Sequence, residues 1–176
     1  MKKNVAYITF LLVLLTACSS ISVNTDYDKK IDFKSYKTYA FYKTGIDKVE
    51  ISDLDKKRIL NSIDEAMTLK GFTKSEKPDL LINFNTKSEK NISVSPYYGG
   101  WGFGYGWNSG YYGNASVYSS IEGVLTIDII DAAKKELIWQ GEGVGILTKN
   151  VDEKEATIKK FVTKIVAQFP PLEQKK

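Results

Sequence analysis

Two segments of this chain repeat apolar residues with helical periodicity along a single stripe, and this feature limits the possible folds most strongly. The stripe of the first segment, expected over residues 53–70, consists of Leu60, Ile63 and Met67, with Ile59 and Ala66 beside it. The stripe of the second, which starts near Asn150, consists of Ile158, Phe161, Val162, Ile165, Val166 and Phe169. A helix with one apolar stripe buries that stripe against another layer, so both helices are expected to cover a sheet.

Residues typical of helix ends bound both segments. Ser52 and Asn150 stand where an N-terminal cap is needed, because their side chains can accept from a free backbone N–H. Gly71 can adopt the left-handed conformation that stops the first helix, with Phe72 folding back toward it. Pro170-Pro171 ends the second helix.

The remaining regular segments alternate apolar and polar residues, as half-buried strands do. They are expected at residues 23–27, 38–42, 80 toward 94, 116–130 and 137–144. The chain order is therefore ββαβββα. This order predicts an α+β two-layer sandwich, in which an antiparallel or mixed sheet of about five strands carries two helices on one face. A doubly wound parallel sheet would need more crossover helices and more continuously apolar strands.

Strict alternation gives further expectations for the last hairpin. Leu137 and Trp139 are expected to share one face, whereas Asp128 and Asp131 straddle a strand end and are expected to be solvated. Residues 141–145 read Gly-x-Gly-x-Gly, but they lack the spacing and the following helix of a dinucleotide-binding loop. A strand bulge or close backbone packing is the better explanation for these glycines.

The first 17 residues have the features of an export signal. Lys2 and Lys3 supply a positive start, and residues 5–17 form a mostly apolar run of 13, shorter than the about 20 that a membrane-spanning helix needs. The run ends in Leu15-Thr16-Ala17-Cys18, which resembles the lipobox of bacterial lipoproteins. That resemblance implies a diacylglyceryl group on Cys18, cleavage before it and acylation of the new N-terminus. The alternative is a plain secretory signal with an incidental cysteine.

The chain is accordingly expected to comprise a lipoprotein signal peptide (1–17), a lipidated Cys with a short tether (18–22) and one α+β domain (23–172). Removal of the signal leaves 159 residues, and a chain of this size buries about 68–70% of its unfolded surface, enough for one core. Ser19 stands where an Asp tends to retain lipoproteins at the inner membrane. By that analogy the palmitate-type anchor is expected in the outer membrane, with the domain in the periplasm.

Composition excludes several functional classes. The chain has no His and a single Cys, which excludes Ser-His-Asp catalysis, histidine metal sites, disulfide frameworks and Cys-rich zinc clusters. The net charge is +4, and it falls to +2 without Lys2 and Lys3, a poor match for a nucleic-acid-binding protein. No cofactor or metal is expected.

Residues 97–113 are unusual, because they contain eight aromatic residues and seven Gly. The rings of Trp101, Phe103, Tyr105 and Trp107 alternate with glycines, so an extended backbone would project all four from one side. The segment is interpreted either as a long low-complexity excursion between two strands or as a contact surface. Aromatic rings suit a protein groove, a bilayer interface or the face of a sugar.

Several separated motifs resemble one family. They are Asp32-Phe33-x-x-Tyr36-Lys37-Thr38-Tyr39-Ala40-Phe41, Pro78-Asp79-Leu80-Leu81-Ile82, the Gly/Tyr/Trp loop, Glu122-Gly123-x-Leu125-x-Ile127-Asp128, Leu137-x-Trp139-x-Gly141 and Phe169-Pro170-Pro171. Over about residues 22–172 the chain is similar to the domain-of-unknown-function family numbered 4136, found in bacterial envelope lipoproteins. The resemblance implies a small α+β lipoprotein domain, and it supplies no catalytic residues.

These observations predict a non-enzymatic, membrane-anchored envelope lipoprotein that binds another envelope component. Recognition is expected through Trp101, Phe103, Tyr105 and Trp107 or through an exposed sheet edge. The alternative is a glycan- or peptidoglycan-binding lipoprotein in which the aromatic rings stack on sugar. An enzyme that relies on carboxylates alone is a third possibility.

Overall fold

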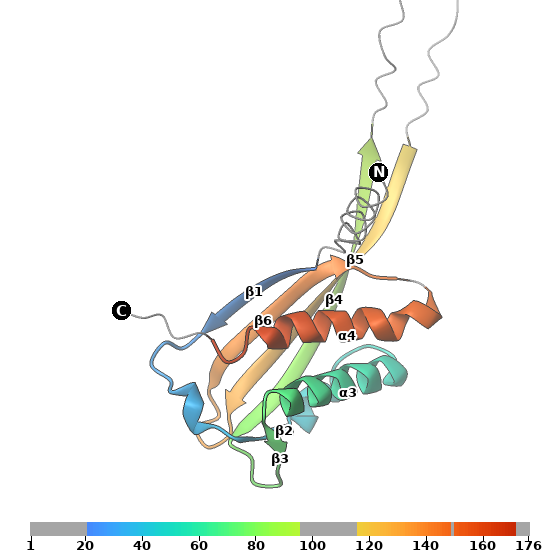
Figure 1. Cartoon of the computed structure of the whole chain (residues 1–176). Helices are drawn as coiled ribbons and strands as arrows, with labels where there is room; N and C mark the ends of the chain where they lie inside the picture. The colour runs from blue at the N-terminus through green and yellow to red at the C-terminus, as the bar shows by residue number, and fades with distance from the viewer. Residues whose placement is uncertain (1–20, 96–115, 149, 172–176) are drawn as a thin grey trace, which may run out of the picture.

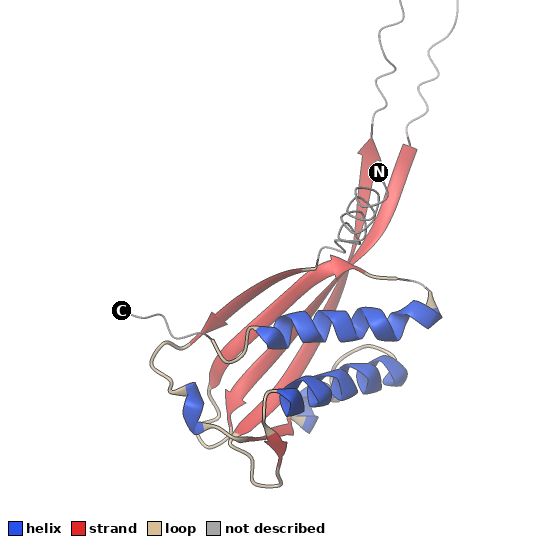
Figure 2. Ribbon diagram, viewed as in Figure 1, coloured by secondary structure: helices blue, strands red, loops and turns tan. Residues whose placement is uncertain are grey.

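The computed structural model describes residues 21–95, 116–148 and 150–171, which form one six-stranded mixed sheet covered by helices. The strands are β1 (Ser22–Tyr27), β2 (Thr38–Phe41), β3 (Thr73–Lys74), β4 (Leu80–Ser95), β5 (Ser116–Asp131) and β6 (Leu137–Ile146). The helices are the 3-10 helix η1 (Phe33–Ser35), the short α2 (Lys43–Ile46) and the long α3 (Asp53–Leu69) and α4 (Val151–Ala167). Figures 1 and 2 show α3 and α4 side by side on one face of the sheet. The predicted α+β two-layer class is confirmed, with β3 and α2 as additional short elements.

The sheet has the order β1-β6-β5-β4-β2-β3. Its long strands pair antiparallel, whereas β2 runs parallel to both β3 and β4. A parallel pair needs a crossover connection, and α3 supplies it between β2 and β4. Both long helices lie on the same face of the sheet. On that face α3 covers the part near β2, and α4 covers the part near β6 and β1.

The two longest strands extend beyond the rest of the sheet. β4 and β5 pair along their whole length, from Leu80 opposite Asp131 to Ser95 opposite Ser116. β6 accompanies β5 only as far as the pair of Ile146 with Glu122. The last six residue pairs of β4 and β5 therefore form a two-stranded ribbon, ~20 Å long, which projects from the body of the domain in Figure 1.

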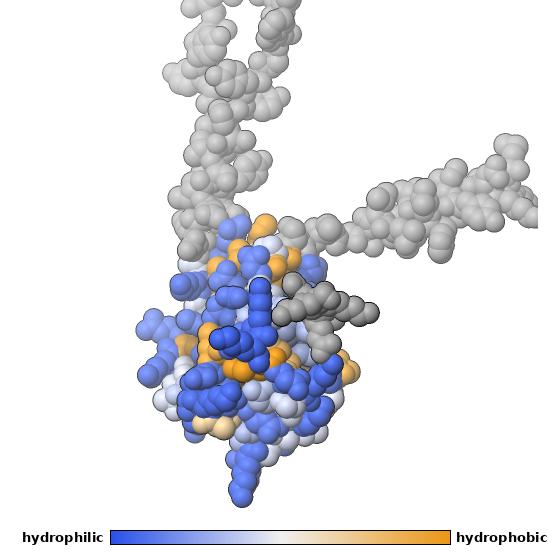
Figure 3. All heavy atoms as spheres, turned by 90° about the vertical axis from the view of Figure 1, so that its left-hand side faces the viewer, coloured by the Kyte–Doolittle hydropathy of each residue, from blue (hydrophilic) through white to orange (hydrophobic). Residues whose placement is uncertain are grey.

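The core lies between the sheet and the two long helices. Its largest fully buried side chains come from both layers: Trp139, Tyr39, Phe84, Phe169, Ile63 and Met67. The ring of Phe169 lies 5.4–5.8 Å, centre to centre, from the rings of Phe33, Phe72 and Trp139. Each fully buried apolar side chain contributes about 1.5–3 kcal/mol, so both predicted apolar stripes help to hold the layers together. Seen from the side of η1, the surface is mostly hydrophilic, with apolar patches between charged side chains (Figure 3).

The predicted helix ends are confirmed. The Ser52 hydroxyl accepts from the backbone N–H of Asp55 at 3.2 Å. At the other end of α3, the N–H of Phe72 donates to the carbonyl of Met67 at 3.1 Å, and Gly71 has φ +85°. This is the hydrogen-bond pattern of a Schellman cap. Asn150 caps α4 by accepting from the N–H of Asp152 at 3.0 Å.

The alternating glycines of β6 allow close packing of α4. A Cβ atom on Gly141 would lie 2.3 Å from Cη2 of Trp139 and 2.6 Å from Cγ2 of Ile165. One on Gly143 would lie 2.8 Å from Cδ1 of Ile165. The helix side chains therefore rest directly on the strand backbone, which confirms the interpretation of these glycines as a close-packing feature.

Two expectations about the last hairpin are wrong. Trp139 is buried, but Leu137 is more than half exposed, because a bulge inserts Ile138 and turns Leu137 to the other face. Asp131 is only 6% exposed. Its carboxylate accepts from the Tyr36 hydroxyl at 2.8 Å and from the backbone N–H groups of Ala133 and Lys134 at 2.9 Å, and these donors replace water.

Candidate functional site

An apolar groove of about 290 Å³ lies between the sheet and the N-terminal halves of α3 and α4; it is called the inter-helix groove below. It opens on the side of the domain where both long helices begin. Its volume is close to the lower limit of about 300 Å³ for small-molecule sites.

Small residues on the sheet create the hollow. On β4, the buried Phe84 is followed on the same face by Thr86 and Ser88. On the neighbouring strands, Gly123 of β5 pairs directly with Gly145 of β6. The starts of the helices thus lie above a part of the sheet where small residues predominate and Leu125 of β5 is the main large side chain.

The walls of the groove are apolar. They are formed by Ile51, Ile59, Leu125, Leu147, Ile158 and Phe161. Leu147 follows β6 and turns over β5, so that its Cδ2 atom lies 2.5 Å from the position of a Cβ atom on Gly123. With 38% of its surface exposed, Leu147 lies between the groove and solvent.

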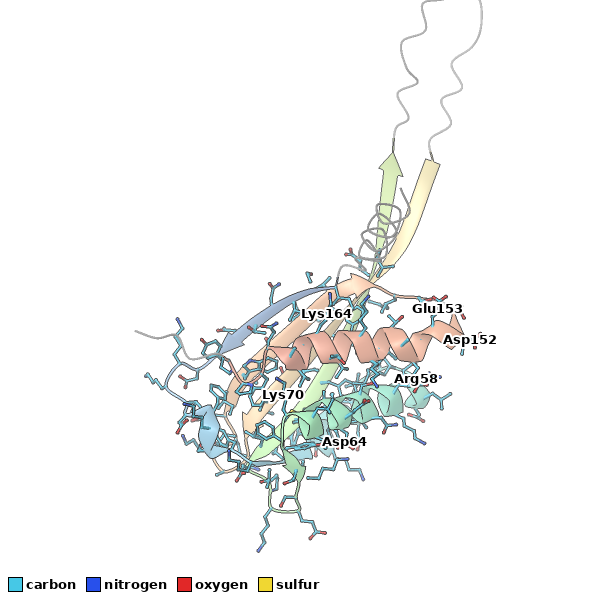
Figure 4. The ribbon with its side chains drawn as sticks, viewed as in Figure 1. Arg58, Asp64, Lys70, Asp152, Glu153 and Lys164 are labelled. Atoms are coloured by element: carbon cyan, nitrogen blue, oxygen red, sulfur yellow. The ribbon has the colours of Figure 1, made fainter. Side chains whose placement is uncertain are left out.

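A group of charged side chains borders the groove and links the two helices. Lys154 Nζ of α4 lies 2.5 Å from Oδ2 of Asp55 on α3, and Arg58 Nη1 lies 2.8 Å from Oδ1 of the same carboxylate. Burial alone would raise the pKa of Asp55, but hydrogen bonds from Lys154, Ser52 and Arg58 outweigh it and lower the pKa below its usual value. Figure 4 labels Arg58 near the start of α3 and Glu153 at the start of α4.

The described chain begins next to this groove. Ile21 is 8% exposed, and its Cγ1 atom and Cζ of Phe161 lie 3.1 and 3.0 Å from the position of a Cβ atom on Gly145. Lys164 Nζ donates to the Ile21 carbonyl at 3.3 Å. The chain is therefore held in place immediately beside Phe161, one of the groove walls.

Several exposed apolar side chains surround the same side of the domain. Leu54, Ile146 and Val151 are 66–68% exposed, and together with Leu147 they are called the apolar rim below. They stand at the start of α3, the end of β6, the start of α4 and the segment between β6 and α4. Leu69 and Leu137 are also exposed, but they lie at other ends of their elements.

Cys18 and the four aromatic residues Trp101, Phe103, Tyr105 and Trp107 lie outside the described residues. The structure does describe the segments that lead to them. Ser22 pairs with Val144 near the end of β6, and the β4–β5 ribbon continues from that same end of the sheet. The described segments that precede these residues thus lie at the same end of the sheet, which sequence reasoning did not predict.

Sequence reasoning missed the inter-helix groove. Its signal was present in β4, where Thr86 and Ser88 interrupt the apolar face, and in the isolated Gly123. Only the strand register shows that Gly123 and Gly145 are neighbours.

Within the ranges that the structure describes, no helix combines the length and the apolar character needed to cross a membrane. Among the same residues, no three carboxylate, thiol or imidazole side chains gather closely enough to hold a metal ion.

Comparisons with known proteins identify a family and similar solved structures. The family model described as Domain of unknown function (DUF4136) matches residues 23–171. No curated protein matches the chain. The chain is similar to the crystal structure of a PDZ domain protein from Parabacteroides distasonis, with 19% sequence identity and a TM-score of 0.56. The match covers 98% of this chain but only 41% of the PDZ domain protein. A PelC dodecamer from Paraburkholderia phytofirmans is 9% identical with a TM-score of 0.45, covering 88% of this chain and 100% of the PelC chain.

Proposed function

Because the chain belongs to the family described as Domain of unknown function (DUF4136), we propose that it is a non-enzymatic envelope lipoprotein, anchored to a membrane, that binds another envelope component. Its anchor is the lipid on Cys18, its membrane is the outer membrane, and its domain lies in the periplasm. The aromatic residues Trp101, Phe103, Tyr105 and Trp107 contact the partner, which is most simply another envelope protein.

The position of Ile21 carries this proposal. Its buried side chain and its hydrogen-bonded carbonyl hold the chain three residues after Cys18. Three residues reach at most about 10 Å, so a lipid on Cys18 would keep this side of the domain close to the bilayer surface. The apolar rim lies on that side, where contact with the membrane interface would cover it.

The β4–β5 ribbon supports a role for the aromatic residues. It projects from the end of the sheet at which β1 begins, and Ser95 and Ser116 form its last described pair. Residues 97–113 belong to the segment that connects Ser95 to Ser116. A ribbon without side support from β6 can carry a contact segment away from the body of the domain, where a partner can reach it.

The anchor is tested by expressing the full chain in a bacterium, either unchanged or as Cys18→Ser, with Ser20→Ala as a matched control. We expect the unchanged chain and the control in the membrane fraction, with an acylated N-terminal peptide in mass spectra. The Cys18→Ser protein should lack the acyl mass. An unmodified thiol in the unchanged protein would refute the anchor.

Partner binding is tested with a photo-crosslinking residue at Trp107, and with the same residue at the exposed Lys77 as a control. We expect one discrete protein adduct from position 107 and none from position 77. No adduct, together with quenching of Trp fluorescence by purified peptidoglycan fragments, would favour glycan binding instead.

A further inference from the structure

We propose that the inter-helix groove holds one acyl chain of the protein's own Cys18-linked lipid while the protein is outside a bilayer. This inference rests on the proposed lipidation. It assigns the groove an occupant that is covalently part of the molecule, and it predicts that the groove empties when the anchor enters a membrane.

The chemistry of the groove suits an unbranched hydrocarbon. Its walls are apolar, and the side chains on its floor are the small Thr86 and Ser88. The charged residues that line it comprise two acids, Glu50 and Asp55, and two lysines, Lys87 and Lys154. Because Asp55 and Lys154 already neutralise each other at 2.5 Å, the groove presents no excess charge to attract an ionic ligand.

The chain length between Cys18 and the fold is sufficient to reach the groove. Ser22 is paired with Val144, and Thr148, which lines the groove, is four residues beyond Val144. Cys18 is likewise four residues from Ser22. Four residues span roughly 13 Å, so the Cys18 sulfur can reach the level of Thr148 without any change in the described fold.

The packing around Ile21 also favours this occupant. Ile21 and Phe161 both lie over Gly145, and Phe161 also lines the groove. The tether, residues 18–22, therefore ends beside Phe161, a wall of the groove. An acyl chain on Cys18 can therefore reach this apolar site and leave water, whereas a bilayer buries the chain completely and should compete successfully for it.

The test uses the full chain produced in a bacterium that is fed a diazirine-containing fatty acid, so that the acyl groups on Cys18 can be photo-crosslinked. Monomeric protein is isolated in detergent-free buffer, and a second sample is reconstituted into phosphatidylethanolamine–phosphatidylglycerol vesicles. Both are irradiated, and the cross-linked peptides are identified by mass spectrometry.

Two substitutions on α4 form a matched pair. Thr157 lines the groove, whereas Thr163 is exposed and lies outside it on the same helix. Thr157→Trp fills the groove and Thr163→Trp does not. Ser88→Trp, at an exposed position on the groove floor, provides a second filling variant in case Thr157→Trp unfolds the domain.

We expect cross-links to residues 154–161 in buffer, at least tenfold fewer with Thr157→Trp or Ser88→Trp, and no change with Thr163→Trp. Vesicles should reduce these cross-links at least fivefold. Labelled protein that cross-links only elsewhere, or equally in vesicles, would overturn the inference and leave the anchor intact. Failure to incorporate the label at Cys18 would overturn both proposals.

Discussion

The Cδ2 atom of Leu147 lies 2.5 Å from the position that a Cβ atom would occupy on Gly123. The glycine on β5 thus leaves the space that the leucine fills after β6 has ended. This relationship shapes one wall of the inter-helix groove, because Leu147 packs over Gly123 and separates the groove from solvent.

Gly123→Ala should displace Leu147 and lower the free energy of unfolding by about 1 kcal/mol, a modest cost because Leu147 is partly exposed and can move. The cost should shrink in a Leu147→Ala background. Urea denaturation of the two single variants and the double variant measures this coupling. Additive effects would show that the two residues do not compete for the same space.

Gly141→Ala should cost more, about 2–3 kcal/mol. Its new Cβ would lie 2.3 Å from Trp139 and 2.6 Å from Ile165, and both side chains are fully buried and cannot move aside. Thermal unfolding followed by far-UV circular dichroism compares it with Gly123→Ala. A loss no greater than that of Gly123→Ala would contradict the close packing of α4 on β6.

The buried Asp131 should make the free energy of unfolding depend on pH in the acidic range. Hydrogen bonding by the Lys134 backbone N–H, with help from Tyr36 and Ala133, outweighs burial and lowers the pKa of Asp131 below its usual 3.8. A lowered pKa means that the unfolded state takes up the proton first, so this contribution is complete above about pH 5 and is lost as the pH falls below 3.8. Asp131→Asn should cost about 1–3 kcal/mol at pH 7, and less at pH 3. An equal cost at both pH values would refute the argument.

Tyr36 should make the free energy of unfolding depend on pH in the alkaline range. Burial, followed by its hydrogen bond to Asp131, raises the pKa of Tyr36 from 10.0 to about 12. Its contribution is therefore complete below pH 10 and is lost as the pH rises toward 12. Burial and a hydrogen bond to Asp64 also raise the pKa of Tyr39, so among the described residues two tyrosines should ionise late. Spectrophotometric titration at 295 nm should show this late phase, and Tyr36→Phe should reduce its amplitude by one tyrosine. A titration unchanged by Tyr36→Phe would contradict the assignment.

The ion pair of Asp55 with Lys154 should couple α3 to α4 at the groove. A double-mutant cycle with Asp55→Asn and Lys154→Met is expected to give a coupling of roughly 1 kcal/mol, because Lys154 is partly exposed and water weakens the attraction. The coupling should decrease in 1 M NaCl. The exposed pair of Lys159 with Glu65, which links the same helices, serves as the reference and should show a smaller value.

Local signals predicted much of this fold from the sequence. Ser52, Gly71 and Asn150 marked helix ends that the structure confirms, since caps depend on hydrogen bonds between near neighbours in the chain. Alternation predicted the long strands, because the two-residue repeat of strand side chains is also visible among near neighbours in the chain. It failed at Leu137, because a one-residue bulge against β5 places Leu137 and Trp139 on opposite faces of the sheet.

The candidate site was predictable only in part. The expected lipidation of Cys18 and the partner-binding role of Trp101, Phe103, Tyr105 and Trp107 rest on motifs and composition, and they remain predictions. The small residues of β4 and β5 hinted at the inter-helix groove, but its position could not be predicted, because its lining comes from two helices, two strands and the segments before α3 and after β6. Asp131 was likewise misjudged, since its main side-chain partner, Tyr36, is 95 residues away.

By itself, the amino-acid sequence determined the identity and ends of the two long helices, the five longer strands and the two-layer class, because periodicity and capping act within a few residues. Only the tertiary structure decided which small residues would meet beneath the helices and leave a groove, and which end of the sheet would adjoin both Ile21 and the ribbon. Those outcomes depend on strand register and helix placement, which are determined by packing contacts between distant parts of the chain.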